Sequence, residues 1–456
     1  MKHYFLLCSL VTLLLFFPLL SSALTKDTFL EVVQTVTRES YFPLDIEQAT
    51  IKALDAFTRH CDTYTRFLGP DDYKELLATT AGGYYGVGLE IAPKTEDQDY
   101  LLILQVKPDG PAAKAGLKFQ DKIIAIDNTS IRHLSLEESL KKLRGEKKHS
   151  AVSLTLIRAG KQFTITLKRD TYLMNTTWSA YLPDQKITYC HISLFTHTTA
   201  TSLKNILEKS VKQKAAGIII DLRDNSGGSL QAAVNCAAHF LPRNSQVVYT
   251  KNRNDVIINK YFTSSAPLIM HQIPIFILVN QNTASAAEVL AKSLSIYSQE
   301  VKPGSTVSPY TFILGTKTFG KGSVQDVLPI GNNCALKLTT ALFYLTDNNT
   351  IHGTGISPDL KVTQKDSLSR TAEISTLPGE KVSRFENKST QPLDYESERL
   401  KALSKDHQIL SAVSFIQLLN LGMTVSSSQI STHESALQWL KDHSSFAQKL
   451  RAESNF

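Results

Sequence analysis

A serine at the start of an alanine-rich segment occupies a position that could serve chemistry. Ser285 lies in NQNTASAAEVLAKSL, residues 280–294, directly after the apolar run IPIFILV. The run predicts a buried strand and the alanine-rich segment predicts a helix. A hydroxyl at such a turn has two uses. Thr283 or Ser285 could cap the helix by accepting from its first N–H groups, or Ser285 could be a nucleophile.

Two further stretches contain groups that a nucleophilic serine needs. Lys321 lies between glycines in GTKTFGKGSVQ, with Gln325 four residues later, and a neutral lysine is a general base. Gly227 and Gly228 end GIIIDLRDNSGG, so a backbone N–H group that follows a strand could be available to bind an oxyanion. The amide of Ala286 would point from a helix N-terminus, where positive partial charge stabilises an oxyanion. Singly, these features are more often a cap, a turn and a solvated loop charge.

The stretches that would position these residues alternate between apolar strands and helices. Strands are predicted at ITYCHISLF, GIIID and PIFILV, with helices at ATSLKNILEKSVKQK, SLQAAVNCAAHFL and SAAEVLAKSL. Continuous apolar strands between helices are typical of a layered α/β architecture. Helical spacing also predicts DTFLEVVQTV and IEQATIKALDAFTRH near the N-terminus, a turn-rich join at FLGPDDY, and two C-terminal helices, roughly residues 395–419 and 432–451.

A β-rich module separates the N-terminal helices from this α/β region. YLLILQVK and DKIIAID predict strands, PDGPAAKAGL a turn with a short helix, SLEESLKKLRG a helix, and AVSLTLIRAGKQFTITLKR a hairpin. This order, opening on GGYYGVGLEI, resembles a PDZ domain. The resemblance implies that a peptide's terminal carboxylate meets backbone N–H groups, and that the peptide extends a strand edge. The residues of that loop are Tyr85, Gly86, Val87 and Gly88.

Together these stretches resemble the carboxyl-terminal processing (tail-specific) serine proteases. The matching text includes TASAAEVLA, GTKTFGKGSVQ, LKLTTALFY, GTGISPDL, GIIIDLRDNSGG and LDAFTRHCDTYTRFLGPDDYKEL, and it covers most of the chain from about residue 57 to residue 360. The resemblance implies a protease core of crotonase- or Clp-protease-like layered α/β fold with an inserted PDZ domain. It also implies a serine endopeptidase that cleaves exported proteins near apolar C-termini.

The same resemblance assigns roles to individual residues. Ser285 is implied to be the nucleophile, Lys321 the general base, and Gln325 the residue that positions the lysine. The amides of Gly228 and Ala286 are implied to form the oxyanion hole. Two features depart from the family pattern, although neither removes a group that the dyad needs. The segment SQEVKPGSTVSPYTF is longer than expected, and an alanine follows Ala286 where a second serine is common.

A lysine base makes a demand on its surroundings, because it must be neutral. Its pKa must fall from about 10.4 toward about 7–8, a change of about 4 kcal/mol against the ammonium. Burial in an apolar pocket can supply this, and Phe319 and Val324 flank Lys321 as candidate walls. Glu288, three residues after Ser285, would oppose the change unless it points away or pairs elsewhere, so we expect it to have a structural role or to be a helix-start charge.

Two other classes of protein stay open. A Ser-His-Asp hydrolase could use His239, His271 or His352, but no G-x-S-x-G motif presents a serine to them. A catalytically inactive PDZ adaptor on a protease scaffold would have lost Ser285 or Lys321, and both are present. The sequence therefore favours an active protease.

Composition excludes several further functions. The net charge of +7 over 456 residues is mild and scattered, so no nucleic acid is expected as a partner. H-E-x-x-H, P-loop and paired Cys/His motifs are absent from the sequence, and we expect no metal or other cofactor. Four widely spaced cysteines follow the N-terminal segment and are predicted to be free buried thiols, with one disulfide left open. They are Cys61, Cys190, Cys236 and Cys334.

The N-terminus predicts export. MKHYFLLCSLVTLLLFFPLLSSA has a basic start, an apolar run and small residues at a cleavage position, which is typical of a signal peptide. A retained membrane anchor is the alternative, and no other stretch is expected to span a bilayer. We expect a periplasmic enzyme, soluble or tethered to the inner membrane, and homo-oligomerisation stays open. The expected division is 1–23 signal peptide, 24–79 N-terminal helical region, 80–170 PDZ domain, 171–365 Ser-Lys protease core, and 366–456 linker and C-terminal helical region.

Overall fold

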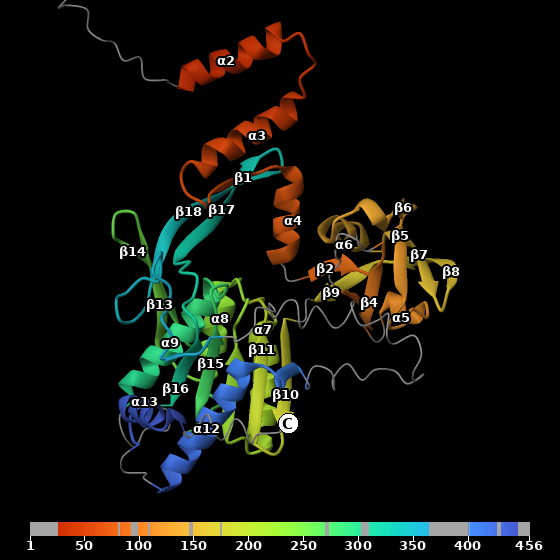
Figure 1. The fold of residues 1–456 in the computed structure, drawn as a ribbon. Helices are drawn as coiled ribbons and strands as arrows, with labels where there is room; N and C mark the ends of the chain where they lie inside the picture. Colours follow the sequence, from red (N-terminus) through yellow and green to blue (C-terminus); the bar gives the residue numbers. More distant parts are fainter. Residues whose placement is uncertain are drawn as a thin grey trace, which may run out of the picture.

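The computed structural model contains a layered α/β core, a second sheet with a long hairpin, a PDZ-like module and N-terminal helices (Figure 1). The predicted signal segment lies outside the described residues. The residues that the structure describes are 26–80, 83–92, 99–107, 110–145, 149–173, 176–269, 273–301, 310–363, 400, 402–425 and 430–445.

The core sheet has the strand order β10-β11-β12-β15-β16-β19. β10 is antiparallel to β11, and each of the other neighbouring pairs is parallel. The carboxyl ends of β12 and β15 therefore meet at one edge of the sheet, and the loops that follow them carry the candidate catalytic groups. The strands are β10 (Thr177–Leu182), β11 (Ile187–Ile192), β12 (Gly217–Asp221), β15 (Ile275–Val279), β16 (Thr311–Gly315) and β19 (Leu360–Lys361).

Helices cover both faces of this sheet, which explains why its strands are continuously apolar. Along β12, Ile218 and Ile220 pack into one hydrophobic cluster and Ile219 packs into the other. The first cluster includes α7 (Thr199–Lys212), α8 (Leu230–Ala237) and α9 (Ala286–Glu300), and the second includes α12 (His407–Val425) and α13 (His433–Asp442).

Helix α12 corrects an expectation about membrane spans. Among the described residues it is one helix that is long and apolar enough to cross a bilayer, although no such stretch beyond the N-terminus was expected. Its side chains pack into the protein instead: Ile409, Val413 and Ile416 are fully buried in the cluster that covers the core sheet. Its apolar composition is thus that of a core helix.

A second sheet carries the hairpin that follows Lys321. Its order is β1-β18-β13-β14, and β17 pairs with the other side of β18. Strand β1 comes from the N-terminal region and places Arg66 opposite Lys337. The N-terminal region is therefore joined to the lysine hairpin. The strands are β1 (Arg66–Leu68), β13 (Gln246–Asn252), β14 (Ile257–Phe262), β17 (Ser323–Gly331) and β18 (Cys334–Tyr344).

The N-terminal region contains the two predicted helices, α2 (Lys26–Glu39) and α3 (Ile46–Arg59), which are confirmed. A third helix, α4 (Pro70–Thr80), occupies a stretch whose start was expected to be a turn. Proline at its first position and two aspartates in its first turn suit a helix start, because the proline needs no N–H partner there and the carboxylates face the positive end of the dipole.

The PDZ-like module is built on a sheet of order β3-β4-β5-β7-β8, with β6 beside β5. Its predicted strands and helices are confirmed. The chain enters and leaves through β2 (Gly83–Gly86) and β9 (Asp170–Leu173), which pair with each other. The module comprises β3 (Leu89–Ile91), β4 (Leu101–Val106), α5 (Pro111–Lys114), β5 (Lys122–Ile126), β6 (Thr129–Ser130), η1 (Ile131–His133), α6 (Leu136–Arg144), β7 (Ala151–Arg158) and β8 (Lys161–Lys168).

Candidate active site

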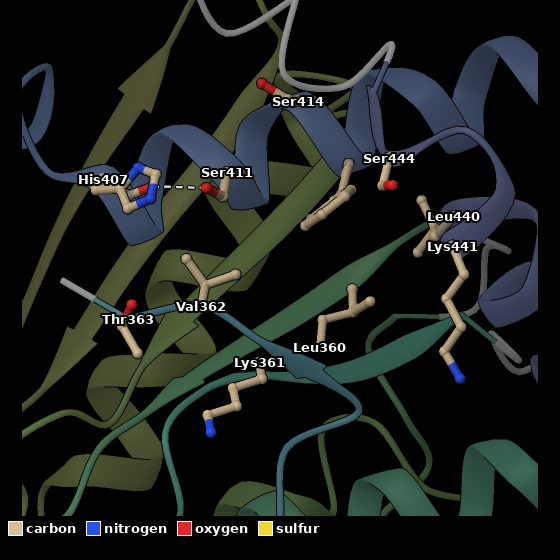
Figure 2. A pocket seen from close by; sticks show the side chains of 11 residues that line it. Leu360, Lys361, Val362, Thr363, His407, Ser411, Ser414, Leu440, Lys441 and Ser444 are labelled. Atoms are coloured by element: carbon tan, nitrogen blue, oxygen red, sulfur yellow. Dashed lines mark hydrogen bonds between the residues drawn. The ribbon is translucent and has the colours of Figure 1, made fainter. Parts of the chain in front are cut away.

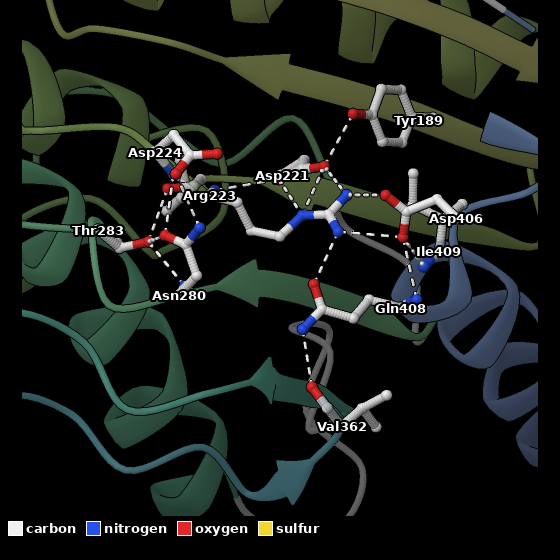
Figure 3. A network of polar contacts seen from close by, with 11 residues as sticks. Tyr189, Asp221, Arg223, Asp224, Asn280, Thr283, Val362, Asp406, Gln408 and Ile409 are labelled. Carbon is white, nitrogen blue, oxygen red and sulfur yellow. Dashed lines mark hydrogen bonds and ion pairs between the residues drawn. The ribbon is translucent and has the colours of Figure 1, made fainter. Parts of the chain in front are cut away.

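Ser285 occupies a strained turn between β15 and α9. Its φ of 57° lies in the left-handed region, which costs a residue other than glycine about 1–3 kcal/mol and is typical of functional sites. Thr283, the alternative cap, is fully buried and donates its hydroxyl to the Leu222 carbonyl at 2.8 Å. Asn280 and Asp224 bond to each other across the same loops (Figure 3). Thr283 therefore fixes the turn to the end of β12, and Ser285 is the residue presented at the start of α9.

The two glycines of the neighbouring loop are needed for this geometry. Gly227 and Gly228 have φ values of 109° and 114°. A Cβ on Gly227 would lie 2.7 Å from the Ser285 Cβ, and one on Gly228 would collide with the Phe195 carbonyl. Within the described part of the chain, the N–H groups of Gly228 and Ala286 donate no hydrogen bond to protein groups. The loop thus lies against Ser285, and both amides remain available to an oxyanion.

Glu288 connects the serine turn to the lysine loop. Its carboxylate is fully buried and accepts from the backbone N–H groups of Ser285 at 2.8 Å and Lys321 at 2.9 Å through the same oxygen. The other oxygen accepts from the Gly320 N–H at 2.8 Å and from the Thr318 hydroxyl. The expected structural role is confirmed, because these donors compensate the buried charge.

Lys321 is half-buried and lies beside a residue that the sequence did not indicate. Its Nζ is 4.9 Å from the centroid of the Tyr64 ring. Burial, followed by the positive charge of Lys337, lowers the pKa of Lys321, which is the direction that a lysine base requires. Within the described residues, no hydrogen bond joins Lys321 Nζ to Ser285 Oγ. The two residues are linked through their backbone N–H groups, which donate to the same Glu288 oxygen.

The walls expected around Lys321 are partly wrong. Phe319 is 57% exposed, because the glycine-flanked loop turns its ring to solvent, whereas Val324 packs against the core. Tyr64 supplies the aromatic surface instead.

Gln325 contacts neither member of the Ser–Lys pair by a hydrogen bond among the described residues. Its amide donates to Ser323 at 2.9 Å and to Thr339 at 3.2 Å, and the Thr339 hydroxyl donates to Asp62 at 3.2 Å. Gln325 therefore belongs to the polar network that holds the turn before β1.

A buried ion-pair network fixes the end of β12 to the C-terminal helices (Figure 3). Arg223 is 1% exposed and bonds to Asp221 at 2.7 Å and Asp406 at 2.9 Å, and it also donates to Gln408 at 2.7 Å. Burial lowers the pKa of Arg223, but the two carboxylates outweigh it and raise the pKa overall. The arginine thus stays charged and joins the catalytic loops to α12.

The predicted PDZ loop is divided in the structure: Tyr85 and Gly86 end strand β2, and Val87 and Gly88 lead from it into β3. Val87 is 3% exposed in the module's core, and its carbonyl accepts from Ala112 N–H at 2.9 Å. The Gly88 carbonyl accepts from Lys107 N–H at 2.9 Å. In the described part of the module, β3 is the terminal strand and pairs on one side only, with β4. A firmly held loop thus leads into a strand whose outer edge a peptide could extend.

The histidines give no support to a Ser-His-Asp site. The His239 ring contacts the Ala200 carbonyl at 2.9 Å, and burial lowers its pKa. His352 is exposed, and His271 lies outside the described residues. None of the described histidines is hydrogen-bonded to Ser285.

The four cysteines are free thiols. Burial raises the pKa of Cys190 to about 12 and also raises that of Cys236, so both are inert core residues. Cys61 is exposed and Cys334 is half-buried, which corrects the expectation that all four are buried. Cys61 lies in the turn after α3, and Cys334 lies at the tip of the β17–β18 hairpin, and neither place is part of a hydrophobic core.

A cavity of about 380 Å³ lies between β19 and helices α12 and α13 (Figure 2). Apolar side chains such as Leu360 and Leu440 line it together with hydroxyl groups and lysines, but its lining contains none of the candidate catalytic residues. Among the described residues, no group of three His, Cys, Asp or Glu side chains could hold a metal ion.

The layered core, the strained serine beside available amides and the partly buried lysine define a serine peptidase that carries a PDZ module. Residues 186–362 match Peptidase family S41, and residues 86–168 match the PDZ domain. The chain belongs to the carboxyl-terminal-processing proteases of this family.

Curated relatives match over most of their length. The carboxyl-terminal-processing protease of Synechocystis sp. is 33% identical over 369 residues, which are 78% of this chain and 81% of that protein. That of Picosynechococcus sp. is 35% identical, over 67% of this chain and 70% of that protein. The carboxy-terminal-processing protease of Bartonella bacilliformis is 31% identical, over 72% of this chain and 73% of that protein.

Proposed function

We propose that the enzyme cleaves exported proteins near their C-termini with Ser285 as nucleophile and neutral Lys321 as general base. Lys321 Nζ takes the Ser285 Oγ proton while Oγ attacks the peptide carbonyl carbon. The amides of Gly228 and Ala286 receive the oxyanion. The protonated lysine gives its proton to the leaving amine as the C–N bond breaks. Lys321 then activates the water that hydrolyses the acyl-serine ester and releases the new carboxyl terminus.

The observation that carries this proposal is the single Glu288 oxygen that accepts from the backbone N–H groups of both Ser285 and Lys321. It keeps the serine turn and the lysine loop adjacent. For Gln325, its bonds to Ser323 and Thr339 support an indirect positioning role through the strand pair that follows the lysine.

The test is turnover of an unfolded protein with an apolar tail by a chain that starts at residue 24. Ser285→Ala and Lys321→Ala should each abolish cleavage. Lys317→Ala is the matched control, because Lys317 is an exposed lysine in the same loop. Mass spectrometry should find the acyl adduct on Ser285 with a slowly hydrolysed ester substrate. Full activity in Ser285→Ala would overturn the assignment of the nucleophile.

The PDZ module would select substrates by an apolar C-terminus. The segment Tyr85, Gly86, Val87 and Gly88 leads from the end of β2 into β3, whose outer edge pairs with no described strand, and this supports the role. An amidated peptide lacks the terminal carboxylate and should bind and be cleaved more weakly than the free acid. Equal binding and cleavage of the two peptides would contradict the proposal. The catalytically inactive adaptor is disfavoured because Ser285 and Lys321 are both present.

We place the enzyme in the periplasm, soluble or tethered by a retained N-terminal segment, with the domain limits 24–79, 80–170, 171–365 and 366–456. The matches over residues 86–168 and 186–362 support the middle limits. Fractionation with N-terminal sequencing of the mature chain tests both cleavage and compartment. A mature chain that begins at Leu24 in the periplasmic fraction supports the placement, and a cytoplasmic chain with Met1 intact contradicts it.

Self-association through α2 is the accompanying proposal. Phe29, Leu30 and Val32 are each more than half exposed on this helix. Burial of such apolar side chains against a second copy of the chain would favour dimer formation. Light scattering should give a mass above that of a monomer, and Val32→Lys should lower it. Binding of the wild-type chain to vesicles with a monomeric mass in solution would assign the helix to a membrane instead.

A further inference from the structure

The turn between α3 and β1 is held rigidly against β18. The Asp62 carboxylate accepts from the N–H groups of Tyr64 at 2.7 Å and Thr65 at 2.9 Å, and from the Thr65 hydroxyl at 2.7 Å. The Thr339 N–H of β18 donates to the Thr65 hydroxyl at 3.1 Å, and the Thr339 hydroxyl donates to Asp62. Burial raises the pKa of Asp62, but the hydrogen bonds to its carboxylate together outweigh burial and lower the pKa overall, so the carboxylate stays charged and keeps the turn in place. The turn therefore presents Tyr64 in a fixed position.

The face of the Tyr64 ring receives the Lys321 ammonium. The distance of 4.9 Å from Nζ to the ring centroid is within the range of a cation–π contact. The attraction acts on the ammonium and is lost when the lysine is neutral. Because Nζ lies over the ring and has no hydrogen bond to Ser285 Oγ in the described structure, the ring competes with the serine for the lysine head group.

Other charges act on the same lysine from each element around it. Lys337 of β18 lies near enough to lower the pKa of Lys321, and Arg66 of β1 adds to the positive charge beside Lys337. Asp62 lies in the Tyr64 turn, and the Glu288 carboxylate of α9 binds the Lys321 backbone N–H. Burial and positive charge thus favour the neutral lysine, whereas the Tyr64 ring favours the ammonium.

We propose that Tyr64 is a positioning residue that holds the Lys321 side chain as an ammonium apart from Ser285, and that it thereby sets the pH at which the lysine becomes available as the base. This inference rests on the proposed role of Lys321. It predicts that the ring delays the onset of activity as pH rises, and that substitutions of the ring move this onset in opposite directions.

The test is the pH dependence of kcat/KM for a peptide with a free apolar C-terminus. Tyr64→Leu removes the π face and should move the midpoint of the rising limb to lower pH, by roughly 0.4 to 1.5 pH units. Tyr64→Trp offers a stronger π face and should move it to higher pH. Tyr64→Phe keeps the ring face and should restore the wild-type midpoint. Tyr41→Leu is the matched control, because Tyr41 is 92% exposed.

The outcomes separate this inference from the proposed function. Midpoints that coincide in Tyr64→Leu, Tyr64→Trp and the wild type, or that shift in the same direction, would overturn the role of Tyr64 while Lys321→Ala remains inactive. Activity in Lys321→Ala would overturn the proposed function itself. If thermal melting shows that Tyr64→Leu does not fold, the direction of the Tyr64→Trp shift decides, because an upward shift supports the inference and any other result contradicts it.

Discussion

Glu288→Gln tests whether the serine turn and the lysine loop depend on one buried carboxylate. Glutamine has nearly the same shape, but it carries no charge and replaces one acceptor oxygen with an NH₂ donor. Glu288 is fully buried and each of its oxygens accepts from two donors, at least one of them a backbone N–H. In either orientation the amide NH₂ therefore faces a backbone N–H that loses its acceptor.

The magnitude follows from the hydrogen bonds that are lost. Hydrogen bonds to a charged group are worth about 1.5–3 kcal/mol each. The side chain should adopt the orientation that costs less, with the NH₂ facing Gly320 and Thr318, because the Thr318 hydroxyl can rotate to accept. One bond from a backbone N–H is then lost, and the free energy of unfolding should fall by about 1.5–3 kcal/mol. The opposite orientation would lose the bonds from both Ser285 and Lys321. Displacement of the serine turn should also lower kcat by at least about tenfold, because catalytic groups must be aligned closely.

The assay is urea unfolding followed by fluorescence, together with kcat on the apolar-tailed substrate. Glu300→Gln is the matched control, because Glu300 is an exposed acid at the other end of α9. We expect it to behave as the wild type. Wild-type stability and kcat in Glu288→Gln would refute the reasoning that this carboxylate holds the site together.

Four further predictions concern Lys321 and the groups around the site. Arg223→Met leaves the fully buried Asp221 and the partly buried Asp406 uncompensated and should destabilise the fold by about 3–5 kcal/mol in urea unfolding, whereas the exposed Arg253→Met should not; equal stabilities would contradict this. Lys321→Arg should be inactive, because a guanidinium does not deprotonate near neutral pH. Since the pKa of Lys321 is lowered and the neutral form is the base, wild-type activity should rise with pH through that lowered pKa; a flat profile from about pH 6 to 10 would contradict a titrating lysine. Gly227→Ala should lose most activity in the same peptide assay, because its Cβ would lie 2.7 Å from that of Ser285. A wild-type kcat in this variant would contradict the prediction and show that the loop can move to accept the methyl group.

Much of the fold could be predicted because local patterns carry it. The strands of the core are continuous apolar runs and the helices have apolar residues at helical spacing, so their existence follows from the chain alone. The same holds for the PDZ-like module. The candidate nucleophile and base were found because their short motifs resemble those of a known family. The helix at Pro70 was missed because a proline and two aspartates suit a turn as well as a helix start.

Other features depend on contacts between residues that are far apart in the chain. Tyr64 reaches Lys321 only because β1 pairs with β18, and the apolar α12 could be assigned to the core only once it lay on the second face of the sheet. Phe319, beside Lys321 in sequence, points to solvent. By itself the sequence determined which segments become strands and helices, because periodicity is a local property. Tertiary structure alone decided which side chains surround the lysine, because burial and side-chain neighbours depend on how the segments pack.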